Sequence, residues 1–254
     1  MPLPETPSFR LDGRRALITG AGRGIGMAAT AALAQAGAAV TLVARSRDEI
    51  ETVAAALRAG GHKAEALVLD VTDAGAVRSA LASREPFDIL VNNAGTNRPA
   101  LMQDVSEADY DAVMAINVKA AFFVAREVAR GLLQAGLPGS IIQISSQMGH
   151  VGGPRRTVYC ASKHALEGMT KALAWELGPK GIRVNTLCPT FIETAMTSAQ
   201  LREPNFRSEV LAKIALARMG QLEDVMGPVV FLASDASALM TGSALMIDGG
   251  WTAA

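Results

Sequence analysis

The sequence contains little cysteine and no long hydrophobic run. Its two cysteines, Cys160 and Cys188, are too few for a disulfide framework. No apolar run approaches the roughly 18 residues that a membrane-spanning helix needs. The N-terminal segment also lacks the basic and apolar regions of a signal peptide. These absences predict a cytoplasmic protein without a membrane partner.

The sequence also lacks an excess of charge of one sign. Its 24 basic and 24 acidic residues cancel, so nothing predicts the polycationic surface of a nucleic-acid-binding protein. The three histidines, His62, His150 and His164, are not spaced as metal ligands, and no cysteine cluster accompanies them. We therefore expect no nucleic-acid partner and a mechanism without a metal ion.

Apolar runs that alternate with helical stretches are the main pattern of the chain. Half of the 254 residues are hydrophobic, which is enough to bury a large core. The alternation indicates one parallel sheet with helices on both faces, and no linker marks a second domain. The predicted strands are Ala16–Ile18, Ala38–Ala44, Ala66–Leu69, Ile89–Val91, Ser140–Ser145, Ile182–Leu187 and Leu245–Ile247.

A glycine-rich turn follows the first predicted strand. Gly20, Gly24 and Gly26 lie between that strand and a predicted helix from Ile25 to Ala36. Glycines there let the backbone approach a pyrophosphate, which the helix N-terminus attracts. Strand, glycine turn, helix and strand form the unit typical of dinucleotide-binding folds. The expected fold is α/β, a Rossmann-like doubly wound parallel sheet in a single domain from residue 11 to residue 254, after a flexible arm of residues 1–10.

Tyr159 and Lys163 lie one helical turn apart, so the lysine can reach the phenol. A free tyrosine is a poor acid at neutral pH, because its pKa is about 10. A nearby cation favours the phenolate and lowers that pKa. The pair therefore predicts a general acid or base.

Several motifs together resemble those of the short-chain dehydrogenase/reductase family. The resemblance extends from about Leu11 to Trp251 and includes a serine thirteen positions before the tyrosine. The residues that carry it are Thr19-Gly20-x-x-x-Gly24-x-Gly26, Asn92-Asn93-Ala94-Gly95, Asn117, Ser146, Tyr159, Lys163 and Ile247-Asp248-Gly249-Gly250.

The resemblance implies an oxidoreductase that interconverts a secondary alcohol and a ketone with NAD(P)(H). Tyr159 would exchange a proton with the substrate oxygen, and Lys163 would stabilise the phenolate and hold the nicotinamide ribose. Ser146 would hydrogen-bond the substrate oxygen, and Asn117 would position a water that links Lys163 to solvent. Ser145 is an alternative to Ser146, although the spacing favours Ser146.

The residues after the second strand bear on the choice of cofactor. No carboxylate precedes Asp48 in that segment, and Arg45 and Arg23 could pair with a 2′-phosphate. NADP(H) is therefore favoured and NAD(H) is possible; Arg45 could instead stack on adenine. The predicted cofactor-binding residues are Gly20, Arg23, Gly24, Ile25, Gly26, Arg45, Asp70, Val71, Asn93, Ala94, Gly95, Tyr159, Lys163, Pro189, Ile192 and Thr194.

The substrate pocket has a weaker signature. Thr190 replaces the glycine that the family usually has after Pro189, and residues 194–207 are the predicted lid. A basic and polar entrance would suit a polyol, a sugar or a sugar acid, although the same arginines could be helix caps or subunit contacts. The predicted substrate residues are Arg98, Gln147, His150 and Arg155, with Asn97 and Arg156 nearby.

Two other functions remain open. In a 3-oxoacyl thioester reductase the exposed arginines would dock an acidic carrier protein, and an inactive nucleotide-binding sensor is the other alternative. Relatives in this family commonly form tetramers. Trp251, close to the end of the chain, and a long apolar-faced helix over Ala112–Leu133 predict a homotetramer.

Overall fold

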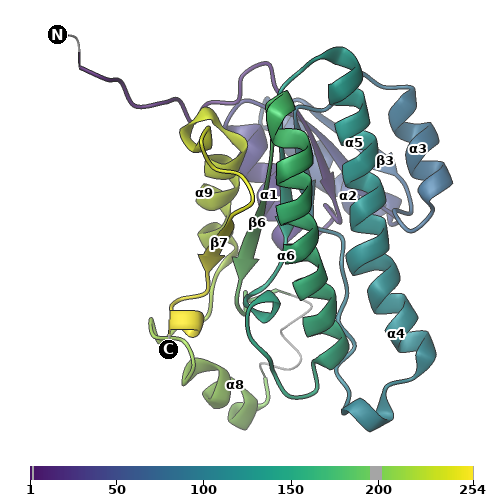
Figure 1. The fold of residues 1–254 in the computed structure, drawn as a ribbon, viewed down its shortest axis with the longest axis vertical. Coiled ribbons are helices and arrows are strands. Elements are labelled where there is room, and N and C mark those ends of the chain that lie inside the picture. The colour runs from purple at the N-terminus through teal and green to yellow at the C-terminus, as the bar shows by residue number, and fades with distance from the viewer. Residues whose placement is uncertain (2, 195–201, 254) are drawn as a thin grey trace.

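The computed structural model describes residues 1, 3–194 and 202–253. In this described part, seven parallel strands form one sheet in the order β3-β2-β1-β4-β5-β6-β7 (Figure 1). Each predicted strand overlaps an observed one, and the predicted fold class is confirmed. The strands are β1 (Arg15–Thr19), β2 (Ala39–Ala44), β3 (Ala64–Val68), β4 (Ile89–Asn92), β5 (Gly139–Ile144), β6 (Ile182–Pro189) and β7 (Ala244–Ile247).

Helices cover both faces of the sheet (Figure 1). One apolar core joins the sheet to α1, α2 and α9, and the other joins it to α3, α5 and α6. Neighbouring residues of β1 show the alternation, because Ile18 belongs to the first core and Leu17 to the second. The helices are α1 (Gly24–Gln35), α2 (Arg47–Ala59), α3 (Ala74–Ala82), α4 (Glu107–Met114), α5 (Ala121–Ala135), α6 (Thr157–Leu177), α8 (Pro204–Leu211) and α9 (Leu222–Ala233).

The helix predicted over Ala112–Leu133 is not continuous. Helix α4 ends at Met114, a π-helical segment spans Ala115–Ala120, and α5 follows it. A π-helical turn holds one more residue than an α-helical turn, so it changes the direction of the side chains within it. Asn117 lies in this segment, and sequence periodicity did not reveal the change of helix type.

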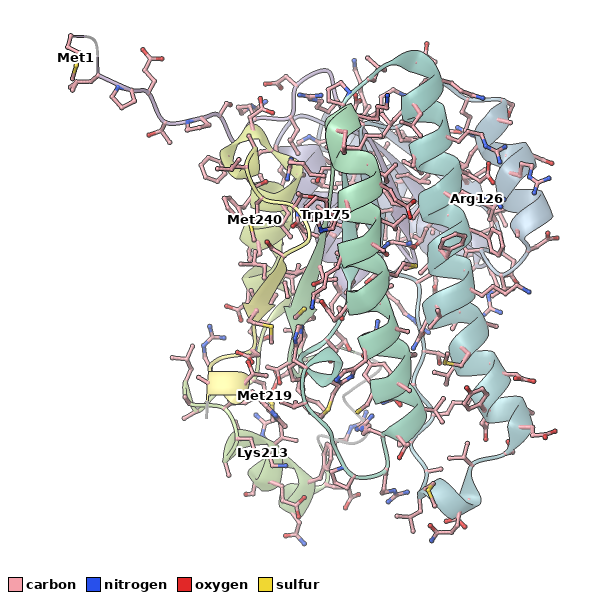
Figure 2. The ribbon with its side chains drawn as sticks, viewed as in Figure 1. Met1, Arg126, Trp175, Lys213, Met219 and Met240 are labelled. Carbon is pink, nitrogen blue, oxygen red and sulfur yellow. The ribbon has the colours of Figure 1, made fainter. Side chains whose placement is uncertain are left out.

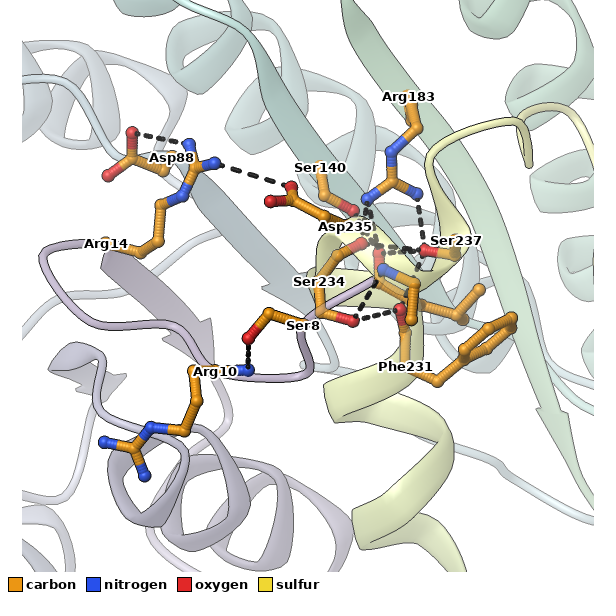
Figure 3. A network of polar contacts seen from close by, with 12 residues as sticks. Ser8, Arg10, Arg14, Asp88, Ser140, Arg183, Phe231, Ser234, Asp235 and Ser237 are labelled. Carbon is orange, nitrogen blue, oxygen red and sulfur yellow. Dashed lines mark hydrogen bonds and ion pairs between the residues drawn. The ribbon is translucent and has the colours of Figure 1, made fainter. Parts of the chain in front are cut away.

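A polar network fastens the end of α9 to the sheet (Figure 3). It lies where β5 and β6 begin, at the edge of the parallel sheet opposite the glycine turn. The Arg183 guanidinium of β6 donates to the Leu232 carbonyl at 2.9 Å and to Ser237 Oγ at 2.9 Å. Ser140 Oγ of β5 donates to the same Leu232 carbonyl at 2.8 Å. These bonds satisfy carbonyl oxygens that the end of a helix leaves without partners.

The N-terminal residues 3–10 are exposed and carry no helix or strand, whereas Leu11 is buried. Figure 2 places Met1 far from the body of the molecule. The predicted lid, residues 194–207, includes residues 195–201, which lie outside the described residues. None of the described helices has the length and apolar character that crossing a membrane requires.

Candidate active site

A cleft of about 550 Å³ lies at the carboxyl ends of the strands. Segments that follow β1, β2, β3, β4, β5 and β6 all contribute to its walls. The chain reverses its direction along the sheet between β1 and β4, since β2 and β3 lie on one side of β1 and the later strands on the other. Ligands of open parallel sheets bind at such a switch point.

The glycine turn after β1 is fixed to the loop after β4. Thr19 Oγ1 accepts hydrogen bonds from the backbone N–H groups of Asn93 and Ala94, both at 2.9 Å. The Asn93 side-chain amide donates to the carbonyls of Thr19 and Gly20, at 2.9 and 3.1 Å. Gly20 has a positive φ of 63°, and a Cβ on Gly26 would lie 2.1 Å from the Gly20 carbonyl oxygen. The turn therefore needs glycine at both positions.

The structure brings Ser146, Tyr159 and Lys163 together on one wall of the cleft. Ser146 follows β5, and the other two lie on α6. Lys163 Nζ donates to the Ile144 carbonyl at 2.8 Å and lies 5.6 Å from the centroid of the Tyr159 ring. Ser146 Oγ donates to Gln147 Oε1 at 2.6 Å and accepts from the Met148 N–H at 3.1 Å. Ser146 also hydrogen-bonds Tyr159.

Burial dominates the electrostatics of this wall. It raises the pKa of the Tyr159 phenol, and the hydrogen bond with Ser146 and the charge of Arg156 oppose it. The sequence predicted the opposite direction, a pKa lowered by Lys163. That expectation is wrong for the protein without cofactor, because the phenol and the ammonium are both removed from water. Burial lowers the pKa of Lys163 itself to about 8.

Asn117 is buried behind the cleft wall, and both Oδ1 and Nδ2 of its side chain hydrogen-bond to the protein. Its Oδ1 accepts from the Thr96 N–H at 2.8 Å, and its Nδ2 donates to the Thr96 carbonyl at 2.9 Å and to Ser162 Oγ at 3.0 Å. The amide thus holds the loop after β4 against α6. The predicted water between Asn117 and Lys163 stays a prediction.

The predicted cofactor residues line the cleft, with the exception of Gly26, which packs behind Gly20. Arg45 is exposed at the end of β2, and its charge helps to lower the pKa of Asp70, mainly set by hydrogen bonds from Thr72. Arg23 Nη1 lies 3.8 Å from Glu49 Oε1. Glu49 also lines this end of the cleft, and sequence reasoning missed it because it is one of several acidic residues in the first turns of a helix.

Three of the polar residues expected at the entrance do line the cleft: Asn97, Gln147 and Arg156. The Arg156 guanidinium lies 5.9 Å from the centroid of the Phe191 ring, which also lines the cleft and which no sequence pattern had marked. Asn97 Oδ1 is buried and accepts no hydrogen bond from any described residue. A buried oxygen of this kind usually meets water or a ligand.

The other three candidates, within the described chain, lie outside the cleft lining. Arg98 forms an ion pair with Asp109 instead. Arg155 is exposed, with a positive φ of 61° that directs the chain into α6. His150 turns away from the cleft and places Nε2 3.4 Å from Glu167 Oε1. Sequence position put these residues beside the entrance, but local pairing and backbone direction removed them from it.

The chain is similar to known dehydrogenases and reductases over nearly its whole length. A family model described as enoyl-(acyl carrier protein) reductase matches residues 20–252. Gluconate 5-dehydrogenase from Gluconobacter oxydans is 39% identical, over 96% of both chains. L-xylulose reductase from Bos taurus is also 39% identical, over 96% of this chain and 99% of its own. A solved gluconate 5-dehydrogenase from Burkholderia cenocepacia, in complex with NADP and tartrate, is 38% identical with a TM-score of 0.94, over 97% of this chain and 98% of its own.

Burial of Lys163 predicts a particular dependence of stability on pH in the absence of cofactor. The unfolded chain keeps this proton up to a pKa of 10.5, whereas the folded protein loses it at about 8. Between these values the unfolded state binds more protons, so this group makes stability rise with pH. Chemical denaturation of the wild type and Lys163→Met should therefore show the wild type gaining stability relative to the variant from pH 8 toward pH 10.5.

Lys171→Met removes an exposed lysine from the same helix and is the matched control. Its difference from the wild type should change less over that range. Parallel pH curves for the wild type and Lys163→Met would show that Lys163 is not destabilised in its charged form by burial.

Proposed function

Because the chain belongs to the short-chain dehydrogenase/reductase family, we infer that it is an NADP(H)-dependent oxidoreductase that interconverts a secondary alcohol and a ketone. The observation that carries this function is the meeting of Ser146, Tyr159 and Lys163 on one wall of a cleft at the switch point of the sheet. Its relatives are named as dehydrogenases and reductases of sugar acids, ketoses and polyols.

The residues that line the cleft fit a dinucleotide. The glycine turn leaves no room for a Cβ at Gly26, and the cleft continues from that turn past Asn93 to Tyr159. When bound, NADP(H) supplies or accepts the hydride. Lys163 would hold the ribose hydroxyls of the nicotinamide half, and Ile192 and Thr194 would contact its carboxamide.

We propose that Tyr159 moves a proton to or from the substrate oxygen. Ser146 hydrogen-bonds that oxygen and steadies the charge that develops on it in the transition state. The raised pKa of Tyr159 keeps the phenol protonated in the free enzyme, which suits proton donation during ketone reduction. The positive charge of Lys163 would favour the phenolate that alcohol oxidation requires.

Removing the phenol oxygen should abolish the chemistry and spare the cofactor site. Tyr159→Phe is expected to reduce kcat by about two to four orders of magnitude, which is the usual contribution of a general acid. NADPH binding, measured by fluorescence, should persist. The only other tyrosine, Tyr110, is half exposed on α4, so Tyr110→Phe is the control and should retain wild-type turnover. Retention of more than roughly a tenth of the turnover by Tyr159→Phe would contradict the assignment. A wild-type protein that binds NADPH but converts none of gluconate, galactitol, xylulose and acetoacetyl thioesters would favour the alternative of an inactive nucleotide-binding sensor.

NADP(H) is the cofactor that the site and the relatives support. The segment that follows β2 presents Arg45 and no carboxylate until Asp48, so the 2′-phosphate has a cation and no repelling group at that point. NADP is bound to the solved relative from Burkholderia cenocepacia and to a second one from Agrobacterium tumefaciens, 40% identical with a TM-score of 0.93. Glu49 beside Arg23 limits how strongly the second arginine attracts the phosphate.

Arg45→Ala should weaken NADPH binding by about 1.5–3 kcal/mol, because a charge-assisted hydrogen bond is lost, and should leave NADH nearly unchanged. Arg47→Ala removes an exposed arginine two positions away that does not line the described cleft, and it should change neither affinity. Equal weakening of NADPH and NADH in Arg45→Ala would indicate stacking on adenine instead.

For the substrate we propose a hydroxylated carboxylic acid, of the sugar-acid class. Arg156 supports this class because its guanidinium lines the cleft close enough to Tyr159 to act on the phenol electrostatically. A guanidinium binds a carboxylate with two parallel hydrogen bonds. The relative from Burkholderia cenocepacia holds tartrate, a hydroxylated dicarboxylate. A polyol or ketose would use Asn97 and Gln147 without needing the arginine.

Arg156→Gln should reduce kcat/KM for the oxidation of gluconate by about 10- to 100-fold, the loss expected for one charged hydrogen-bonding partner, mostly through KM. The neutral substrates galactitol and xylulose should be affected less than threefold. Arg155→Gln, a change at the exposed neighbour, is the control and should alter neither class. Equal losses for charged and neutral substrates would assign Arg156 a structural role.

Reduction of 3-oxoacyl thioesters is the alternative activity, and the same assay can test it. The match to a family model described as enoyl-(acyl carrier protein) reductase favours a test of thioesters. Acetoacetyl thioesters should be reduced more slowly than keto-sugars and keto-sugar acids. The reverse ranking would support the 3-oxoacyl thioester reductase.

We further propose a cytoplasmic homotetramer. Helices α5 and α6 expose Phe122, Leu133 and Trp175, and Trp175 is 86% exposed on the outer face of α6 (Figure 2). Exposed apolar side chains on helices that cover the same face of a sheet are typical of subunit interfaces. Trp251 is half-buried against Phe191 of its own chain, at 5.9 Å between ring centroids, which supports a smaller role for it in assembly than the sequence predicted.

Light scattering at micromolar concentration should give about four times the chain mass of 26.4 kDa. Trp175→Glu should lower that mass, because it places a charge in the proposed interface. The surface variant Glu223→Gln on α9 serves as the control and should keep the wild-type mass. A wild-type monomer that is stable and active would refute the assembly.

A further inference from the structure

Three side chains that can bind a metal ion meet beneath α6, outside the cleft lining. His150 comes from the turn that follows Ser146, Glu167 from α6 one turn after Lys163, and Cys188 from β6. No sequence spacing joins them, since 17 and 21 positions separate them along the chain. The parallel order of β5 and β6, with α6 crossing between them, brings them to one place.

The three ligand atoms form a nearly equilateral triangle. His150 Nε2 lies 3.4 Å from Glu167 Oε1 and 3.5 Å from Cys188 Sγ, and Cys188 Sγ lies 3.4 Å from Glu167 Oε1. Tetrahedral zinc with bonds of about 2.0–2.3 Å has ligand atoms about 3.3–3.6 Å apart. One ion would therefore reach all three atoms with little movement of the side chains.

The surroundings also suit a metal centre. Glu167 and Cys188 are buried, whereas the His150 side chain is 31% exposed, so an ion can enter past the imidazole and keep one position for water. The second carboxylate oxygen of Glu167 accepts a hydrogen bond from Thr186 Oγ1 at 2.9 Å. A bond of this kind holds a ligand carboxylate in a fixed orientation.

We propose that His150, Glu167 and Cys188 form a binding site for a thiophilic divalent cation of the zinc class, with water as the fourth ligand. Binding forms a metal–sulfur bond at Cys188 and releases the thiol proton to solvent, with no change in oxidation state. Hard cations such as Mg²⁺ gain little from sulfur and would not displace that proton. Without the ion, the same atoms are satisfied by hydrogen bonds among the three side chains.

Occupation of this site has a consequence for the cleft. Glu167 lies one turn after Lys163 on α6, and both side chains are buried, so a charge bound at the Glu167 carboxylate acts on the Lys163 ammonium at short range. Binding adds two positive charges and converts the Cys188 thiol to a thiolate, so the site gains one net positive charge behind Lys163, which opposes protonation of the lysine. The site would therefore be inhibitory: an ion bound there lowers the turnover of an enzyme whose proposed chemistry uses no metal.

The test is a titration of the metal-free, full-length protein with Co²⁺, without cofactor or substrate. The wild type should bind one Co²⁺ per chain and develop the charge-transfer absorption of a cobalt–thiolate bond, and Zn²⁺ should displace the signal. Cys188→Ala should abolish the absorption. His150→Gln should weaken Co²⁺ binding roughly 100-fold or more. The controls replace the remaining cysteine and an unrelated histidine, Cys160→Ala and His62→Gln, and both should bind as the wild type does.

Absence of the charge-transfer absorption in the wild type, or its survival in Cys188→Ala, would overturn the proposal. His150→Gln changes a partly exposed side chain and gives a second variant if Cys188→Ala does not fold. In turnover assays, Zn²⁺ should inhibit the wild type reversibly and leave Cys188→Ala unaffected. Equal inhibition of both would place any inhibitory ion elsewhere. The Co²⁺ titration involves no substrate, so its failure would leave the proposed oxidoreductase function untouched.

Discussion

The hydrogen bonds between the glycine turn and the loop after β4 are the contact on which the rest of the site depends. Thr19 binds two successive backbone N–H groups of that loop, and Asn93 returns two bonds to the turn. These groups lie at the carboxyl ends of β1 and β4, the two strands between which the sheet changes direction. The turn and the loop are held together there, and three positions after Asn93 the backbone of the same loop is bound by Asn117.

A second constraint is the free-energy cost of burying the Lys163 ammonium and the Tyr159 phenol on α6. Lys163 is buried, and its ammonium donates a hydrogen bond to the Ile144 carbonyl. Burial therefore works against the charged forms of both Tyr159 and Lys163. This burial is unfavourable for stability, and it brings the pKa of Lys163 to about 8, closer to neutral pH than its usual value. Glu167, one turn further along the helix, compensates part of that cost.

Functional side chains follow one another along the buried side of α6. Tyr159 and Lys163 line the cleft, and one turn after Lys163 the side chain of Glu167 meets Cys188 and His150. The outer surface of the helix exposes Trp175 (Figure 2). The proposed catalytic wall, metal site and subunit interface thus share one helix.

The sequence by itself determined the fold class, the family and the order in which functional residues follow the strands. Hydrophobic periodicity, glycine placement and motif spacing are local properties of a chain. The sequence therefore predicted the cleft residues after each strand, from Gly20 to Ile192. Only the tertiary structure decided the direction of the Tyr159 pKa, since burial depends on packing from distant segments. The tertiary structure also decided that Arg156 lines the cleft while His150 joins Glu167 and Cys188. Residues that meet from separate elements leave no regular spacing in the sequence, and neither does the π-helical turn at Asn117.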